Sequence, residues 1–302
     1  MPLRRPWPLR PGDRVAVVAP AASFDRASFD AGMKILAQRY VPVFDRRIFD
    51  SDRYLAGSDA RRLAELTAAL SDESVRGIFC ARGGYGTMRL LLSFSAIGLQ
   101  AKPLVGFSDL TTLHLVLQRE GWVTFHGPVV TQLGRQTKET VDRLFQLLES
   151  SEVAPPLLGG SALVPGQVEG PFVGGNLSVL TRLLGTPYMP SLKGAVLLLE
   201  DVGERPYRLD RMWTHLQLAG VFDQVAGIVL GDFSLCEEKG ASYTSVDVLR
   251  SLAEETKLPC AMGFPIGHGD TNVAVPLGVR VRLDATRGTL EFLEPATATG
   301  TA

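Results

Sequence analysis

The sequence predicts an α/β protein with a parallel sheet in its first half and a smaller mixed domain in its second half. Three observations predict this class. The chain has 302 residues and 45% hydrophobic content, enough to fill the cores of two domains. Short apolar runs alternate with amphipathic segments in the first half, as in an open sheet covered by helices on both faces. A stretch rich in Pro, Gly, Ser and Ala then interrupts this pattern.

The interrupting stretch sets the domain boundaries that we expect. Its composition is typical of a segment that crosses between domains. We therefore predict an N-terminal α/β domain at residues 1–150, a linker at 151–170 and a C-terminal mixed α/β domain at 171–302.

The expected elements of the first half follow from the spacing of its apolar residues. The run from Arg14 to Pro20 indicates a buried strand that ends at a proline. Similar runs predict strands near 41–44, at 77–81 and at 102–107, and amphipathic segments predict helices at about 28–38, at 59–71, after Gly86 and at 110–119.

The second half has fewer and more varied elements. The strongly apolar run from Gly194 to Glu200 predicts a buried strand. The other expected elements are a helix at about 209–218, a strand at 225–231, a helix at 246–255 and paired strands at 279–283 and 289–292.

Composition and charge exclude several classes of function. Lys plus Arg (31) nearly equal Asp plus Glu (32), so no net field attracts nucleic acid or an anionic membrane. No stretch approaches the apolar length of a membrane span, and we expect a soluble cytoplasmic protein. Cys80, Cys236 and Cys260 stand alone in apolar contexts, which indicates buried free thiols rather than disulfides or a zinc site. We expect neither a metal nor a cofactor.

Ser108 is the first candidate for chemistry. The segment around it reads as strand, tight turn and helix, so its hydroxyl would be exposed near a helix N-terminus. Backbone N–H groups of a first helical turn lack intrahelical acceptors and can stabilise an oxyanion. The segment resembles a nucleophile elbow, but Leu110 replaces the last glycine of the Gly-x-Ser-x-Gly form. The alternative is that Ser108 caps the following helix.

The glycine-rich segment from Ala81 to Gly86 follows another predicted strand. Glycines there allow backbone amides to approach a ligand, so a second oxyanion donor could come from this segment. Neither the Gly-x-x-x-x-Gly-Lys spacing nor a Gly-x-Gly-x-x-Gly fingerprint is present, which argues against a phosphate site. A purely structural turn remains the alternative.

Glu200 closes an apolar strand, where its carboxylate could orient a histidine. Asp201 and Glu204 compete with it, but successive strand residues face opposite ways, so at most one of Glu200 and Asp201 should point into a site. The charged segment that follows, with Asp210 and Arg211, indicates salt bridges and caps at a helix start.

The sequence has four histidines, and a base for a serine nucleophile most often comes from this residue type. His114 and His215 lie in predicted helices, where a partly buried packing role is expected. His126 follows a short apolar run and is the rival candidate. We prefer His268, because its glycine-flanked loop can expose a catalytic imidazole. Neither His126 nor His268 has a second His or Cys at ligand spacing.

Taken together, these segments resemble the LD-carboxypeptidase family, which includes murein-recycling peptidases and a microcin C immunity peptidase. The resemblance runs along the whole chain as several motifs in order. They are Leu9–Pro20, Ala81–Gly86, Val105–Thr111, His126–Pro128, Gly174–Ser178, Leu199–Glu204 and Gly267–Asp270.

The resemblance implies roles for individual residues. It implies a triad of Ser108, Glu200 and His268, and an oxyanion hole made by the backbone amides of Asp109 and of a glycine, Gly84 being preferred over Gly83. For the substrate carboxylate, which needs a cationic or amide partner, Arg82 and Asn176 are the candidates.

The resemblance also implies a fold, an assembly and a substrate. The fold pairs a flavodoxin-like N-terminal domain with a swivelling β/β/α C-terminal domain, with the site in the cleft between them. The expected assembly is a homodimer. The expected reaction is hydrolysis of an LD peptide bond that releases D-alanine from murein tetrapeptide. Two alternatives remain: a microcin-type peptidase that cleaves aminoacyl-sulfamoyl nucleotides, and a non-catalytic protein that binds a peptide or sugar.

Overall fold

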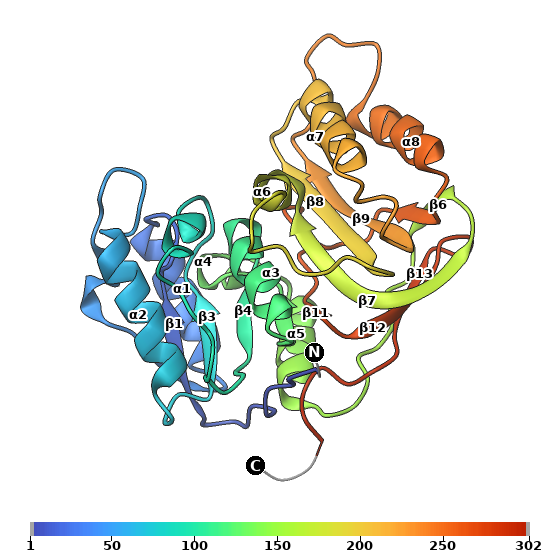
Figure 1. The fold of residues 1–302 in the computed structure, drawn as a ribbon. Helices are drawn as coiled ribbons and strands as arrows, with labels where there is room; N and C mark the ends of the chain where they lie inside the picture. Colours follow the sequence, from blue (N-terminus) through green and yellow to red (C-terminus); the bar gives the residue numbers. More distant parts are fainter. Residues whose placement is uncertain (1–2, 300–302) are drawn as a thin grey trace.

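The computed structural model describes residues 3–299, which form two β-sheets, each with its own helices. Figure 1 shows the N-terminal sheet on one side and the curled second sheet on the other, with the long, bent strand β7 lying between β12 and β8 in the second sheet. Among residues 3–299, no helix has both the length and the apolar character needed to cross a membrane.

The N-terminal sheet has the strand order β11-β5-β4-β3-β1-β2, and all its neighbouring strands are parallel except β11. Without β11 this is the flavodoxin-like order. The strands are β1 (Arg14–Val18), β2 (Val41–Val43), β3 (Gly77–Cys80), β4 (Leu104–Gly106), β5 (Thr124–His126) and β11 (Val275–Leu277).

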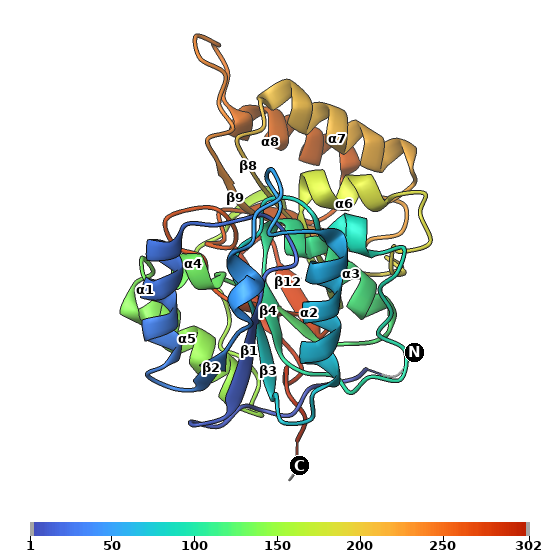
Figure 2. The same ribbon diagram turned by 90° about the vertical axis from the view of Figure 1, so that its left-hand side faces the viewer.

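Helices cover both faces of the N-terminal sheet, because apolar residues point alternately to either side of each strand. Val17 and Phe79 belong to a core with α1 and α5, whereas Val18 and Ile78 pack with α2 and α3. Figure 2 shows these two helical layers on opposite sides of the strands. The helical segments are α1 (Arg26–Leu36), η1 (Arg46–Phe49), α2 (Asp59–Ser71), η2 (Thr87–Leu90), η3 (Ser108–Leu110), α3 (Thr111–Arg119), α4 (Val130–Leu133) and α5 (Lys138–Glu149).

The second sheet has the order β13-β12-β7-β8-β9-β10-β6, parallel from β7 to β10 and antiparallel outside them. Its helices share an apolar core with β8 and β9 and lie on one side of the sheet (Figures 1 and 2). The strands are β6 (Ser161–Val164), β7 (Gln167–Asn176), β8 (Val196–Val202), β9 (Gly227–Ser234), β10 (Cys260–Met262), β12 (Arg280–Asp284) and β13 (Thr289–Phe292); the helices are α6 (Leu177–Leu183), α7 (Pro206–Leu218) and α8 (Ser245–Thr256).

The expected α/β class is confirmed, and most expected elements are present within a few residues. Helix α2 has the predicted bounds, because Ser58 caps its first turn by accepting a hydrogen bond from the Arg61 N–H. The helix expected after Gly86 is wrong: η2 is a single 3₁₀ turn, and its first N–H donates to the Asp109 carboxylate.

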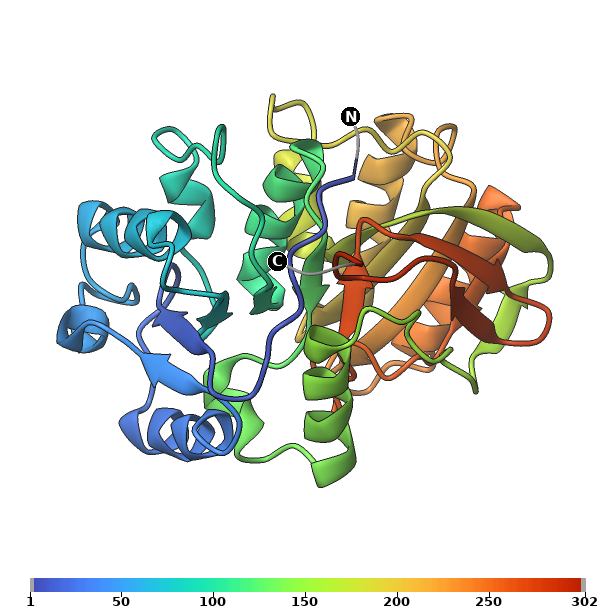
Figure 3. The same ribbon diagram turned by 90° about the horizontal axis from the view of Figure 1, so that it is seen from below.

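Two segments differ from the division drawn from composition. The expected linker at 151–170 contains β6 and the first residues of β7, which belong to the second sheet. Strand β11, far along the chain, pairs antiparallel with β5 and completes the N-terminal sheet (Figure 3). The C-terminal part of the chain is therefore built into both sheets.

Candidate active site

Ser108 stands two residues after the end of β4, in a backbone conformation that non-glycine residues rarely adopt, with φ of 64°. This conformation turns the chain sharply from strand to helix, as in a nucleophile elbow. No side-chain capping bond is present at the start of either η3 or α3, so Ser108 does not cap a helix here. The hydroxyl makes no hydrogen bond with any residue of the range 3–299 and is available for chemistry.

The glycine segment lies against Ser108. A Cβ atom added at Gly83 would lie 2.9 Å from the Ser108 Cβ, so a glycine is required for this approach. The next residue, Gly84, has φ of 98°, and a Cβ there would lie 2.7 Å from that of Ala22. Within the described residues, the N–H groups of Gly84 and Asp109 donate to no protein acceptor. The peptide between Gly83 and Gly84 thus presents an uncommitted donor near the serine.

The segment that follows the glycines is fixed by polar contacts that sequence reasoning missed. Thr87 donates its N–H and its hydroxyl to the Asp109 carboxylate at 2.8 Å. The buried Arg62 guanidinium bonds the carbonyl oxygens of Pro20 and, at 2.8 Å, of Gly86. Burial raises the pKa of Asp109, and the bonds from Thr87 oppose this shift. Thr87 and Asp109 had one sequence signal, their position beside the glycine and serine motifs, whereas Arg62 had none.

Glu200 and His268 meet at the carboxyl end of β8. Their atoms Oε2 and Nδ1 lie 2.6 Å apart, and Glu200 is fully buried. Burial raises the pKa of Glu200, and the bond to His268 opposes this. Burial alone would lower the pKa of His268, but the hydrogen bond and charge of Glu200 outweigh it, so this pKa is raised.

The imidazole ring of His268 is held next to the serine segment. Its centroid lies 4.7 Å from that of Phe107, the residue before Ser108, and 15% of its side chain is exposed. A Cβ at Gly267 would lie 2.6 Å from the Glu200 Oε2, which explains the glycine before this histidine. Asn272, which the sequence did not single out, accepts a hydrogen bond from the Gly267 N–H at 3.1 Å and closes the loop.

Two of the other three histidines lie near the serine segment without contacting Glu200: the His126 ring centroid is 5.6 Å from that of Phe107, and His114 bonds the end of β4. His126 is fully buried at the end of β5, makes no bond to a carboxylate, and its pKa is lowered by burial. His114 bonds the Gly106 carbonyl oxygen at 2.8 Å, and burial lowers its pKa to about 4. The partly buried role expected for His215 is wrong, because its position on α7 exposes it to solvent.

A buried polar network joins the serine helix to the strand that carries Glu200. The Thr111 hydroxyl oxygen at the start of α3 accepts a hydrogen bond from the Asn176 N–H at 2.9 Å. The Asn176 side-chain amide donates to the Asp201 carboxylate at 3.1 Å, and Ser178 donates to the same carboxylate twice at 2.8 Å. Asp201 and Glu200 therefore serve different partners, as strand alternation predicts.

The two residues expected at a substrate carboxylate differ in availability. Arg82 is exposed beside the glycine segment, with one guanidinium N–H donating to the Ser23 carbonyl oxygen at 2.8 Å. Asn176 is 4% exposed, and its side-chain oxygen accepts a hydrogen bond from the Val179 N–H as the cap of α6. Arg82 is thus more accessible to a substrate carboxylate than Asn176 is.

Residues 3–299 contain no group of three or more His, Cys, Asp or Glu side chains arranged to hold a metal ion. The three cysteines are free and buried, as the sequence predicts, and burial raises the pKa of the Cys236 and Cys260 thiols to about 12. These thiols are poor nucleophiles.

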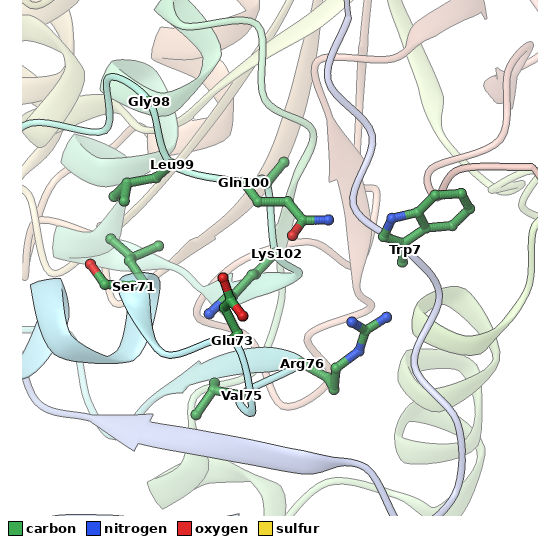
Figure 4. A pocket seen from close by; sticks show the side chains of 11 residues that line it. Trp7, Ser71, Glu73, Val75, Arg76, Gly98, Leu99, Gln100 and Lys102 are labelled. Carbon is green, nitrogen blue, oxygen red and sulfur yellow. The ribbon is translucent and has the colours of Figure 1, made fainter. Parts of the chain in front are cut away.

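One cavity of about 230 Å³ lies away from Ser108, against the amino ends of β3 and β4 (Figure 4). Trp7, Glu73, Arg76 and Lys102 line it. The Lys102 ammonium donates to the carbonyl oxygens of Ala69 and Asp72, so it caps the end of α2. Ligands of parallel α/β sheets bind at the opposite, carboxyl ends of the strands, where Ser108 lies.

Comparison with known proteins agrees with this geometry. Residues 15–127 match the LD-carboxypeptidase N-terminal domain, and residues 169–283 match the LD-carboxypeptidase C-terminal domain. The chain belongs to the LD-carboxypeptidase family. It is thereby a peptidase.

Three relatives extend over almost the whole chain. A putative carboxypeptidase of Synechocystis is 39% identical, covering 96% of this chain and 97% of its own. A probable murein peptide carboxypeptidase of Bacillus subtilis is 37% identical, with 94% and 93% covered. A murein tetrapeptide carboxypeptidase of Pseudomonas aeruginosa is 33% identical, with 91% and 94% covered.

Solved structures share the two-domain fold. The muramoyltetrapeptide carboxypeptidase of Oxalobacter formigenes superposes with a TM-score of 0.81 at 27% identity, covering 92% of this chain and 97% of its own. The microcin immunity protein MccF in complex with glutamyl sulfamoyl guanosine gives a TM-score of 0.88 at 22% identity, with 97% and 99% covered. The expected pairing of a flavodoxin-like domain with a second, mixed domain is confirmed.

Proposed function

We propose that this protein is a serine-type LD-carboxypeptidase that releases the terminal D-alanine from murein tetrapeptide. The observation that carries the proposal is the buried Glu200, hydrogen-bonded at 2.6 Å to His268, beside a serine with positive φ. The relative from Pseudomonas aeruginosa named for murein tetrapeptide supports the choice of substrate.

In the proposed mechanism, His268 is the general base. Ionised Glu200 can only accept, so the His268 Nδ1 carries the hydrogen of their bond and Nε2 has a free lone pair. Nε2 takes the Ser108 proton as Oγ attacks the carbonyl carbon of the scissile bond. The same proton then passes to the nitrogen of the departing D-alanine. Water attacks the acyl-serine with His268 again as base, which restores the free hydroxyl.

The developing oxyanion needs donors that require no rearrangement. The N–H groups of Asp109 and Gly84 fit this role, because neither has a protein acceptor in the described chain. For the free carboxylate of D-alanine we propose Arg82, which is cationic and exposed, in preference to the engaged Asn176.

Replacement of Ser108 by Ala tests the proposal. Tri-, tetra- and pentapeptides of murein are incubated with each protein, and mass spectrometry records the loss of one alanine. We expect the native protein to shorten the tetrapeptide and Ser108→Ala to reduce turnover by about 10³-fold or more, with an unchanged melting temperature. Retained turnover in the variant would exclude Ser108 as the nucleophile.

A microcin-type peptidase is the second candidate, favoured by the high TM-score to MccF. Such a peptidase would use the same catalytic residues to cleave an aminoacyl-sulfamoyl nucleotide. Comparing kcat/KM for such a nucleotide with kcat/KM for murein tetrapeptide separates the two candidates. A non-catalytic binding protein would bind the peptide, release no product and leave Ser108 unlabelled by a serine-reactive probe.

We also propose that the enzyme is a cytoplasmic homodimer. Three free buried thiols are in keeping with a reducing compartment. Cell fractionation and sedimentation of the purified protein test the compartment and the assembly separately.

A further inference from the structure

Two tyrosine rings lie next to the glycine segment and remain open to solvent. Tyr54 is 52% exposed and Tyr85 is 46% exposed. Their ring centroids are 5.8 Å apart with an angle of 59° between the planes. Tyr207 and Tyr243 are also exposed, but no described aromatic ring pairs with either. Single exposed apolar side chains are ordinary, whereas two exposed rings in contact with each other offer a ligand a continuous aromatic surface.

Both tyrosines project from backbone that is firmly held. The tight turn from Asp52 to Leu55 is closed by two backbone hydrogen bonds of 3.0 and 2.9 Å, and the Ser23 N–H donates to the Tyr54 carbonyl oxygen at 3.1 Å. Figures 1 and 2 show the segments before α2 and after β3 at the same end of the N-terminal domain.

The same anchors extend to the glycine segment. The Ala22 N–H donates to the Gly83 carbonyl oxygen at 3.2 Å, and a Cβ at Gly86 would lie 2.8 Å from Leu55 Cδ2. The backbone that carries the two rings is therefore held in place relative to Ser108 before a substrate arrives.

We propose that Tyr54 and Tyr85 form an aromatic ledge that binds the sugar of a muramyl peptide. This inference rests on the proposed function, which supplies the peptide. A pyranose ring has an apolar face of C–H groups with partial positive charge, which matches the negative face of an aromatic ring. Two rings inclined to each other offer faces in two directions, which suits a puckered sugar better than a flat base.

The distances permit this placement. In a tetrapeptide, three residues separate the scissile bond from the sugar, and three extended α-linked residues already span about 11 Å. Gly83 contacts Ser108, and Tyr85 is two residues further along the chain. The Tyr85 backbone therefore lies within about 7 Å of Gly83. The side chain adds further reach. A sugar attached to the bound peptide thus falls within range of the ledge.

The test compares two murein substrates that differ only in the sugar: free tetrapeptide and N-acetylmuramyl tetrapeptide. The readout is the ratio of their kcat/KM values. We expect the native protein to favour the sugar-bearing substrate, and Tyr54→Ala and Tyr85→Ala each to reduce that ratio about three- to tenfold. Tyr54→Phe and Tyr85→Phe keep the aromatic ring and should therefore retain most of the preference for the sugar-bearing substrate.

Tyr207→Ala is the matched control, because Tyr207 is 51% exposed on α7 and outside the ledge. Equal losses on both substrates, or an unchanged ratio in the Ala variants, would overturn the ledge and leave the proposed function standing. Failure of the native protein to cleave either murein substrate, with turnover of aminoacyl-sulfamoyl adenosine instead, would overturn the proposed function and the ledge together.

Discussion

At the scale of the residue, the approach of Gly83 to Ser108 is a steric requirement that can be tested directly. Gly83→Ala places a methyl group 2.9 Å from the Ser108 Cβ, inside normal contact distance. The serine or the glycine segment must shift, and a displacement of about 1 Å can cost roughly 100-fold in rate. We expect Gly83→Ala to lower kcat/KM by about ten- to 100-fold with a small change in melting temperature.

Gly98→Ala is the matched control for that prediction. Gly98 has φ of 80° with no atom within 4 Å of an added Cβ, so the substitution strains the backbone without crowding a neighbour. It should cost about 1 kcal/mol of stability and leave kcat/KM unchanged. Full activity in Gly83→Ala would show that the close approach has no catalytic consequence.

A second residue-scale prediction concerns pH. Glu200 raises the pKa of His268 above its ordinary value of 6.5, and the imidazole acts as a base only when neutral. As pH falls through this raised pKa, His268 gains a proton and kcat/KM should fall, with a midpoint above about 6.5. Glu200→Gln removes the charge, so the midpoint should move to lower pH while kcat drops by about 10²- to 10⁴-fold.

The pH dependence of kcat/KM, measured from pH 4.5 to 9 for both proteins, checks this prediction. The proteins must stay folded over that range, which circular dichroism verifies. An acid limb at the same pH in both proteins would show that Glu200 does not set the pKa of the catalytic base.

The sequence predicted part of this residue-scale picture. The order of motifs, through the family resemblance, selected Glu200 and His268, which lie in hydrogen-bond contact. The sequence predicted a tight turn at Ser108 but not its positive φ, since serine seldom adopts this conformation and only tertiary contacts maintain it. The bonds of Thr87 and Asn272 also escaped prediction, because one joins residues 22 positions apart and the other depends on the shape of a loop.

At the scale of the element, the contact between α3 and the end of β7 sets the position of the serine helix relative to Glu200. Thr111→Val keeps the side-chain shape but leaves the Asn176 N–H buried without its acceptor, which costs about 1–3 kcal/mol. We expect lower stability, together with a fall in kcat larger than any rise in KM. Thr111→Ser keeps the acceptor and should retain most of the activity.

Melting temperature, kcat and KM of the two Thr111 variants test this prediction. A purely structural role would lower the melting temperature of Thr111→Val without changing kcat per folded molecule. Equal behaviour of the Val and Ser variants would show that the hydroxyl does not position the helix. The sequence placed both segments at strand ends, but a contact between residues 65 positions apart has no local signal.

At the scale of the whole molecule, the two halves of the chain are less separate than composition indicates. Strand β11 escaped prediction because it has three residues with Pro276 in the middle, and proline weakens a strand signal. An edge position tolerates that proline. The Ala298 N–H also donates to the Pro6 carbonyl oxygen at 2.8 Å, so the last described residues are bonded to the first strand-free segment of the chain.

The last prediction follows from β11. Val275 and Leu277 are fully buried against the N-terminal sheet, and burial of two such side chains stabilises by about 3–6 kcal/mol. A fragment of residues 1–150 loses this strand and exposes the edge of β5. The unpaired N–H and C=O groups of an exposed edge can pair with another chain, which promotes aggregation. We expect the fragment to aggregate, or to exchange the amide hydrogens of β5 far faster than the full chain does. Equal protection of β5 in fragment and full chain would show that residues 1–150 fold independently.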